Sequence, residues 1–337
     1  DAAFDRTSGW TGGDGAYSTA LGGERVLWMF GDTFVSSVRN GRRVDAHLIN
    51  NSAAIQTGRE PSDAALAFFY RTLTDGGPAA FLQPADGTGW IWPYHGVRTA
   101  EGLFLFLLQI VPADGPAAFG FKPVSTWLGK VSNPEEPPER WSVSQQKIPW
   151  GHARRLFGSS VLLQKGYCYI YGTVDVEAGG VTARHMIVAR VPAEELGDFN
   201  AWRFFAGGDW VAEADRAGRV CENVASEFSV SYQPVPGRYV LVYTEGGLSA
   251  NIVLRFSPRP EGPWGEPTRV YRCPEVGRDP RIFCYAAKGH PELAGAPEEL
   301  IVTYMANATD FALLESDARL YRPRFLRVTF SQKPLFD

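Results

Sequence analysis

The sequence predicts an all-β protein, a five-bladed β-propeller built from four-stranded antiparallel blades. Three observations predict it: an apolar strand pattern recurs five times, a second strand follows each copy, and helical patterns are few. The 337 residues include 36 glycines and 24 prolines, which is typical of a chain with many turns. No domain boundary is visible, so we predict a single catalytic domain over residues 1–337.

The first recurring segment is apolar at successive positions, so both faces of the strand must be covered. Such a strand is typical of one that lies between packed sheets. Five copies in this chain leave about 67 residues for each repeat, and the length beyond one blade predicts long loops. The five copies are Arg25–Phe30, Leu103–Leu108, Tyr167–Tyr171, Tyr239–Tyr243 and Leu300–Tyr304.

A second strand pattern follows each apolar copy. Three of its copies lead through a proline-containing segment to Trp141, Trp202 and Trp264, which lie 61 and 62 residues apart. This regular spacing favours repeated blades over the alternative, a two-sheet sandwich with long loops. The five copies are Ser52–Ile55, Ser125–Gly129, His185–Ala189, Asn251–Arg255 and Arg324–Val328.

Composition excludes several classes of partner. The chain carries 33 basic and 37 acidic residues, a net charge of −4, without a run of like charge. Nothing therefore favours binding to nucleic acid or to an anionic membrane, and no stretch of 18 apolar residues predicts a membrane span. The four cysteines lack the spacing of a zinc site, and we predict neither a metal nor a cofactor.

A short motif of small and polar residues precedes each apolar strand by about 8–13 residues. In a propeller the first strand of each blade lines the central channel, so the five motifs are expected to meet at one mouth of that channel. The polar residues that we expect around this pocket are Asp14, His95, Ser160 or its neighbour Ser159, Glu227 and His290.

The ends of the apolar strands add a second group of candidates. Asp32 follows one such strand between two phenylalanines, where a carboxylate is costly to bury unless it is paired or used. Asp14 and Asp32 belong to adjacent strands of one blade, so their carboxylates are expected to lie close together. Glu245, Asn307 and Asn51 are further candidates for polar contacts with a substrate. The indole of Trp92 is a candidate apolar platform for a sugar ring, as are those of the nearby Trp10, Trp28 and Trp90.

Carboxylates that share a pocket suit glycosidic hydrolysis. One acid protonates the leaving oxygen, and a second acts as base or nucleophile at the anomeric carbon. We predict that Asp14 and Asp32 form the catalytic pair and that Glu227 orients or replaces one of them. Simpler interpretations stay open: the two aspartates can be turn or cap residues, Glu245 can be a loop residue, and His95 and His290 can be core histidines.

Several segments resemble the bacterial family of domains of unknown function numbered 4185. They are Gly12–Ser18, Leu27–Phe34, Tyr169–Thr173, Val188–Pro192 and Ala287–Leu293. That family is similar to the five-bladed propeller glycoside hydrolases, some of which are endo-D-arabinanases. The resemblance implies a secreted or periplasmic bacterial enzyme that acts on a polysaccharide, and it points to Asp14 and Asp32 as the matching acidic positions. Since the chain starts at Asp1 rather than Met, we expect any signal peptide to have been removed.

The leading hypothesis is therefore a glycoside hydrolase for a furanoside-containing polysaccharide, with D-arabinan as first candidate. A carbohydrate-binding propeller without catalysis is the second hypothesis. A polysaccharide lyase is the third, and it requires a cationic pocket for the uronate carboxylate.

Overall fold

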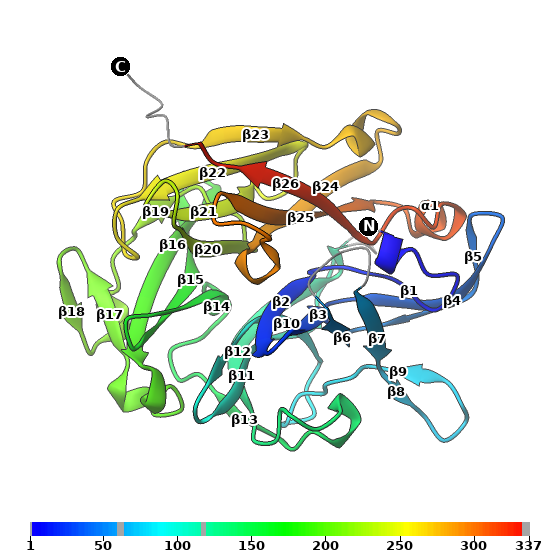
Figure 1. Cartoon of the computed structure of the whole chain (residues 1–337), viewed down its shortest axis with the longest axis horizontal. Coiled ribbons are helices and arrows are strands. Elements are labelled where there is room, and N and C mark those ends of the chain that lie inside the picture. The colour runs from blue at the N-terminus through cyan, green and yellow to red at the C-terminus, as the bar shows by residue number, and fades with distance from the viewer. Residues whose placement is uncertain (1, 59–63, 116–118, 332–337) are drawn as a thin grey trace.

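The computed structural model describes residues 2–58, 64–115 and 119–331, and the strands dominate it (Figure 1). They form five antiparallel sheets that follow one another along the chain, with a smaller three-stranded sheet and a two-stranded one beside them. Within the described ranges the only α-helix is the short α1 (Phe311–Ser316), and no described helix is long and apolar enough to cross a membrane.

In the five sheets each strand pairs with the strand of the same sheet that precedes it along the chain, except the last strand of the third sheet. The first sheet contains β2 (Tyr17–Gly22), β3 (Arg25–Phe30), β6 (Ser52–Thr57) and β7 (Ala65–Phe69). The second contains β10 (Trp90–Thr99), β11 (Gly102–Pro112), β12 (Phe121–Val131) and β13 (Val143–Lys147). The third contains β14 (Arg155–Gln164), β15 (Tyr167–Ala178), β16 (Val181–Pro192), β17 (Arg203–Ala206), β18 (Asp209–Val211) and β19 (Cys221–Glu222), which pairs with β16. The fourth contains β20 (Phe228–Gln233), β21 (Arg238–Thr244), β22 (Asn251–Ser257) and β23 (Thr268–Arg272), and the fifth contains β24 (Ile282–His290), β25 (Glu299–Ala308) and β26 (Pro323–Thr329).

The repeated patterns of the sequence fall on equivalent strands. All five apolar segments lie in the second strand of a sheet, and the five following segments lie in the third strand. The prediction of four strands for every sheet is wrong for two of them. The third sheet has six strands because the β17–β18 hairpin and β19 extend it, and the fifth has three among the described residues.

The first strands of neighbouring sheets lie against each other in chain order. Contacts join β2 to β10, β10 to β14, β14 to β20 and β20 to β24. Strand β24 then meets the beginning of the chain again, because Lys288 donates to the carbonyl of Gly15 and the ring of His290 is hydrogen-bonded to Ser18. The apolar core consists of clusters between adjacent sheets, as expected for strands covered on both faces.

Three of these first strands carry an irregularity at the same relative position. The pairing register shifts between Pro93 and Gly96 in β10, between Phe157 and Ser160 in β14, and between Tyr285 and Lys288 in β24. Bulges of this kind redirect side chains and are common next to active sites. At Gly158, where φ is +94°, a Cβ would come within 2.2 Å of the Phe106 ring, so only glycine fits.

The repeat pattern did not predict an extra sheet, which consists of β1 (Ser8–Gly13), β4 (Thr33–Arg39) and β5 (Arg42–Ile49). The guanidinium of Arg43 fixes it to the C-terminal part of the chain. This buried group donates to the carbonyls of Thr11, at 2.8 Å, and Leu320, at 2.9 Å, and lies over the Phe34 ring. The β5 strand ends directly before Asn50, which this insertion brings to the candidate site.

The two remaining two-residue strands, β8 (Arg71–Thr72) and β9 (Pro78–Ala79), form a small hairpin. All four cysteines are buried and free. Trp10 and Trp28 are also buried, so the prediction that they offer platforms to a sugar is wrong. Phe4 packs edge-on against both indoles, which places them in the core.

Candidate active site

A cavity of about 290 Å³ lies where the beginnings of the first strands meet the ends of neighbouring strands. Three carboxylates line it, those of Asp14 and Asp32 in the segments that flank β2 and β3 and that of Glu227 directly before β20, as do Trp92 and Asn307. All five are residues that the sequence predicted for one pocket. The other polar lining residues are Arg184, Ser226, Tyr94, Tyr285 and Tyr321, and the remainder of the lining is largely apolar.

Backbone hydrogen bonds hold Asp14 beside Asp32. The Asp14 amide donates to the carbonyl of Asp32 at 3.1 Å, and the Gly31 amide donates to the carbonyl of Asp14 at 3.0 Å. A Cβ at Gly31 would come within 2.4 Å of Asp14 Oδ1. The glycine between Phe30 and Asp32 is therefore needed to leave room for the first carboxylate.

Two tyrosines hold the Asp14 side chain. The hydroxyl of Tyr285 donates to Asp14 Oδ2 at 2.6 Å, and that of Tyr321 donates to the same oxygen at 2.9 Å. Burial, and next the charge of Asp32, raise the pKa of Asp14 to about 8, although both hydrogen bonds act in the opposite direction. The group thus holds a proton near neutral pH.

Asp32 has different partners. The indole N–H of Trp92 donates to Asp32 Oδ1 at 2.8 Å, and the amide of Asn50 lies 3.5 Å from the same oxygen. Burial raises the pKa of Asp32 to about 6, while these two donors lower it. Because Asp14 and Asp32 interact, the two carboxyls titrate as a pair.

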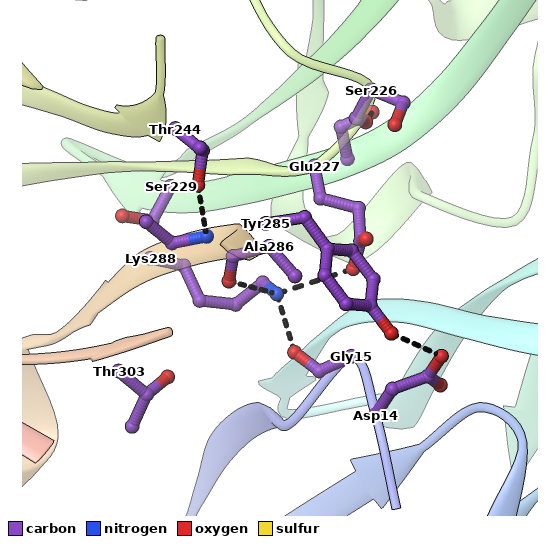
Figure 2. A network of polar contacts seen from close by, with 12 residues as sticks. Asp14, Gly15, Ser226, Glu227, Ser229, Thr244, Tyr285, Ala286, Lys288 and Thr303 are labelled. Carbon is purple, nitrogen blue, oxygen red and sulfur yellow. Dashed lines mark hydrogen bonds and ion pairs between the residues drawn. The ribbon is translucent and has the colours of Figure 1, made fainter. Parts of the chain in front are cut away.

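The third carboxylate faces a buried ammonium (Figure 2). Lys288 Nζ lies 3.2 Å from Glu227 Oε1 and donates to the carbonyls of Ala286, at 3.0 Å, and Gly15. It also lies 4.1 Å from the centre of the Tyr17 ring. Burial lowers the pKa of Lys288, and the charge of Glu227 opposes this effect. The pair places the Glu227 carboxyl group in the cavity next to an amine that the protein, rather than solvent, surrounds.

Arg184 is the cationic side chain among the described residues that line the cavity. Arg184 of β16 pairs with Asp175 of β15 through two hydrogen bonds of 2.7 Å each. Both Arg184 and Lys288 are thus already bound to carboxylates of this chain. The described lining offers no unpaired cation for a uronate, which disfavours the lyase hypothesis.

Five other predicted residues lie outside the cavity lining. Asn51 bonds to the backbone of Leu82 and Ile91, and Ser160 accepts from the Val230 amide. Glu245 is exposed and accepts from Asn251. Hydrogen bonds within the protein explain these positions better than contacts with a substrate.

The two histidines among those five connect first strands. His95 Nε2 lies 3.1 Å from the carbonyl of Ser18, and its Nδ1 accepts from the Val161 amide at 2.9 Å. The ring therefore links β10 to both neighbouring strands. His290 is buried between Ser18 and Thr303. Burial lowers the pKa of both, that of His95 to about 4, so both are neutral structural residues at physiological pH.

Tyr285, Tyr321 and Arg184 belong to the site without having been predicted. Tyr285 lies three residues before Lys288, and the pairing register shifts between them. The regular alternation of side chains along a strand therefore does not predict that Tyr285 faces the cavity. Tyr321 follows α1 in an irregular segment that carries no repeat signal. Arg184 and Asp175 face each other across the β15–β16 hairpin. Their opposite charges are the sequence signal that could have identified this pair.

The arrangement combines a carboxyl group that holds its proton near neutral pH, that of Asp14, with one of lower pKa, that of Asp32, and with the Glu227 carboxylate beside Lys288, in a cavity with apolar walls. Such a set can donate a proton to one oxygen and accept a proton from a water molecule. Among the described residues, no group of three or more His, Cys, Asp or Glu is placed to hold a metal ion.

Comparison with solved structures shows similarity at the level of the fold. A candidate hydrolase from Bacteroides ovatus superposes with a TM-score of 0.78 and 18% identity, covering 97% of this chain and 88% of that one. A thermostable family-43 glycoside hydrolase gives a TM-score of 0.54 and 15% identity, covering 96% and 92%. A family-43 enzyme from Xanthomonas citri in complex with xylotriose gives 0.50 and 15%, covering 98% and 92%.

A search of the curated proteins finds no match to this chain. The family model described as a domain of unknown function, DUF5005, matches residues 1–330. The chain therefore belongs to the DUF5005 family.

Proposed function

We propose that the protein is a glycoside hydrolase and that Asp14, Asp32 and Glu227 carry the reaction. The observation that carries the proposal is the convergence of three carboxylates on one cavity, with the pKa values of two of them raised toward neutrality. Hydrolysis of a glycoside needs one protonated and one ionised carboxyl group near the anomeric carbon. This cluster supplies both at neutral pH.

In the reaction the bond between the anomeric carbon and the leaving oxygen breaks. A carboxyl of the cluster gives its proton to that oxygen, and another takes a proton from the water whose oxygen becomes bonded to the anomeric carbon, directly or after a covalent intermediate. Trp92 serves as the apolar face against which a sugar ring packs, since its indole lies at the cavity wall.

The fold supports this assignment. We infer that the five sheets are blades of a propeller closed by contacts of β24 with the Gly15 and Ser18 region. Glycoside hydrolases of family 43 are among its structural neighbours, and one of them was solved with xylotriose. A likeness of this degree supports the architecture, while the carboxylates of this chain support the chemistry.

For the substrate we propose a furanoside-containing polysaccharide, with D-arabinan as the first to be tested. The support is the resemblance of several segments to a family related to endo-D-arabinanases. A polymer of this kind also fits a secreted or periplasmic location, which fractionation of cells that express the full-length gene can test.

The experiment is a panel of D-arabinan, L-arabinan and xylan, incubated with the wild type and with Asp14→Asn, followed by product chromatography. We expect saccharides from at least one polymer with the wild type and none with the variant. Binding by isothermal titration without any product would support a carbohydrate-binding protein instead. A product with ultraviolet absorbance from a new double bond would indicate a lyase.

A further inference from the structure

Large apolar side chains gather at the mouth of the cavity. Leu248, Phe119 and Phe311 are 53%, 40% and 38% exposed, and all three line the cavity together with Phe283. They come from separate segments: the β21–β22 loop, the residues before β12, the start of α1, and β24. We refer to these four residues as the apolar collar. Exposed apolar groups that converge from distant segments on one opening indicate a ligand surface.

Aromatic contacts connect the collar to the carboxylates. The Phe119 and Phe283 rings lie 6.3 Å apart, and Phe283 lies 5.6 Å from Tyr285, whose hydroxyl donates to Asp14. On another wall Phe121 packs edge-on against Trp92, 4.5 Å between centroids, and Trp92 donates to Asp32. Aromatic side chains therefore lead from the exposed Phe119 to Asp14 on one wall, and from Phe121 to Asp32 on the other.

Hydroxyl-rich ligands would find few free partners along this route. Apart from the acids and tyrosines, the polar side chains of the described lining are Arg184, Asn307 and Ser226. Arg184 is paired with Asp175, and Asn307 is hydrogen-bonded to Tyr285 and to the amide of Ala308. A sugar hydroxyl that loses water without gaining a partner costs free energy, whereas an apolar group gains from the same burial.

We propose that the substrate carries an apolar group, aromatic or alkyl, on the leaving side of the scissile bond, and that the apolar collar binds it. This inference rests on the proposed glycoside hydrolase activity. The sugar enters toward Asp14 and Asp32, and the apolar group remains at the mouth. On hydrolysis the bond between the anomeric carbon and the leaving oxygen breaks, the part of the polysaccharide that carries the apolar group departs as an alcohol with the donated proton, and the hydroxyl of water stays on the sugar.

The test compares glycosides that differ in the apolar surface of the leaving group but hardly in its acidity. Benzyl, methyl and 2-hydroxyethyl glycosides of α-D-arabinofuranose, α-L-arabinofuranose and β-D-xylose serve as probes. We expect kcat/KM for the benzyl glycoside to exceed that for the methyl and 2-hydroxyethyl glycosides by about 10-fold or more, because burial of a ring of this size contributes that much binding.

Collar variants then test the location. Leu248→Ser and Phe311→Ser should each reduce the benzyl-to-methyl ratio of kcat/KM by about 3- to 10-fold. Leu163→Ser is the matched control, because Leu163 is 44% exposed but does not line the cavity. Equal rates for the three glycosides, or ratios unaffected by the collar variants, would overturn the inference.

Failure of the proposed function gives a different result. If no glycoside is hydrolysed, isothermal titration of the wild type with the benzyl and methyl glycosides still decides the inference. Tighter binding of the benzyl glycoside that Leu248→Ser abolishes would support the collar while refuting hydrolysis. Absence of this preference would overturn the collar as well.

Discussion

Replacement of Tyr285 by phenylalanine tests how the site controls its protons. The substitution removes one hydroxyl, which donates to Asp14 Oδ2 at 2.6 Å, and keeps the ring that packs against Phe283. That hydrogen bond lowers the pKa of Asp14, against the larger effect of burial. Its loss should therefore move the pKa of Asp14 further up.

The magnitude follows from the strength of the lost bond. A hydrogen bond to a charged group contributes about 1.5–3 kcal/mol, and 1.36 kcal/mol corresponds to one pH unit at 25 °C. The pKa of Asp14 should rise by roughly 1 to 2 pH units, from its value of about 8. Tyr321 continues to donate to the same oxygen, which favours the lower end of this range.

The assay is the pH dependence of kcat/KM, which reports the titrating groups of the free enzyme. One limb of the profile should move to higher pH: the alkaline limb if Asp14 must be protonated, the acidic limb if it must be ionised. The direction is the same in both cases, and the limb that moves identifies the role of Asp14.

Tyr232→Phe is the control, because Tyr232 is 41% exposed and does not line the cavity. Its profile should superpose on that of the wild type. If both limbs stay in place in Tyr285→Phe while its melting temperature is unchanged, the account of proton control at Asp14 is refuted.

Three further predictions concern the carboxylates. Asp14→Asn, Asp32→Asn and Glu227→Gln should each reduce kcat by at least 100-fold without loss of the circular dichroism spectrum, and full activity in any of them removes that residue from the reaction. Because the folded protein raises the pKa of Asp14 from 3.8 to about 8, this carboxyl favours folding below about pH 4, and that contribution disappears as the pH rises through about 8. Asp14→Asn should therefore melt on the order of 3 °C higher than the wild type at pH 8 but at the same temperature at pH 3.5, and a lower melting temperature at pH 8 would contradict this. Glu245→Gln should keep kcat/KM within about twofold of the wild type in the same assay, because Glu245 is exposed and outside the cavity, and a large loss would return it to the substrate site.

The strand pattern could be predicted from the sequence because burial on both faces leaves a clear mark. Runs such as Leu103–Leu108 have no polar face, and each one marks the second strand of a sheet. The extra sheet β1-β4-β5 escaped prediction because β4 and β5 mix buried and exposed positions without the continuous burial of the repeated strands, and because the sheet interrupts the first repeat. Nothing in a linear pattern shows that Arg43 will hold it against Leu320.

The acids of the site could be predicted because repeats place equivalent positions together. Asp14, Asp32 and Glu227 needed only the assumption that similar segments meet at one end of the fold. The histidines were ambiguous, because a polar residue at an inner strand can link strands as well as face a ligand. His95 links three strands through both ring nitrogens, and its neighbours in the sequence do not indicate these contacts. Tyr285 and Tyr321 required knowledge of a bulge and of an irregular segment.

The most direct test of the central claim is cleavage in water enriched with oxygen-18. If the protein hydrolyses a glycosidic bond through Asp14, the wild type releases a sugar whose anomeric hydroxyl carries the heavy isotope, the leaving alcohol stays unlabelled, and Asp14→Asn releases neither product. Mass spectrometry of both products measures this. Label in the alcohol, cleavage without any label, or no cleavage of any polymer or glycoside tested would contradict it.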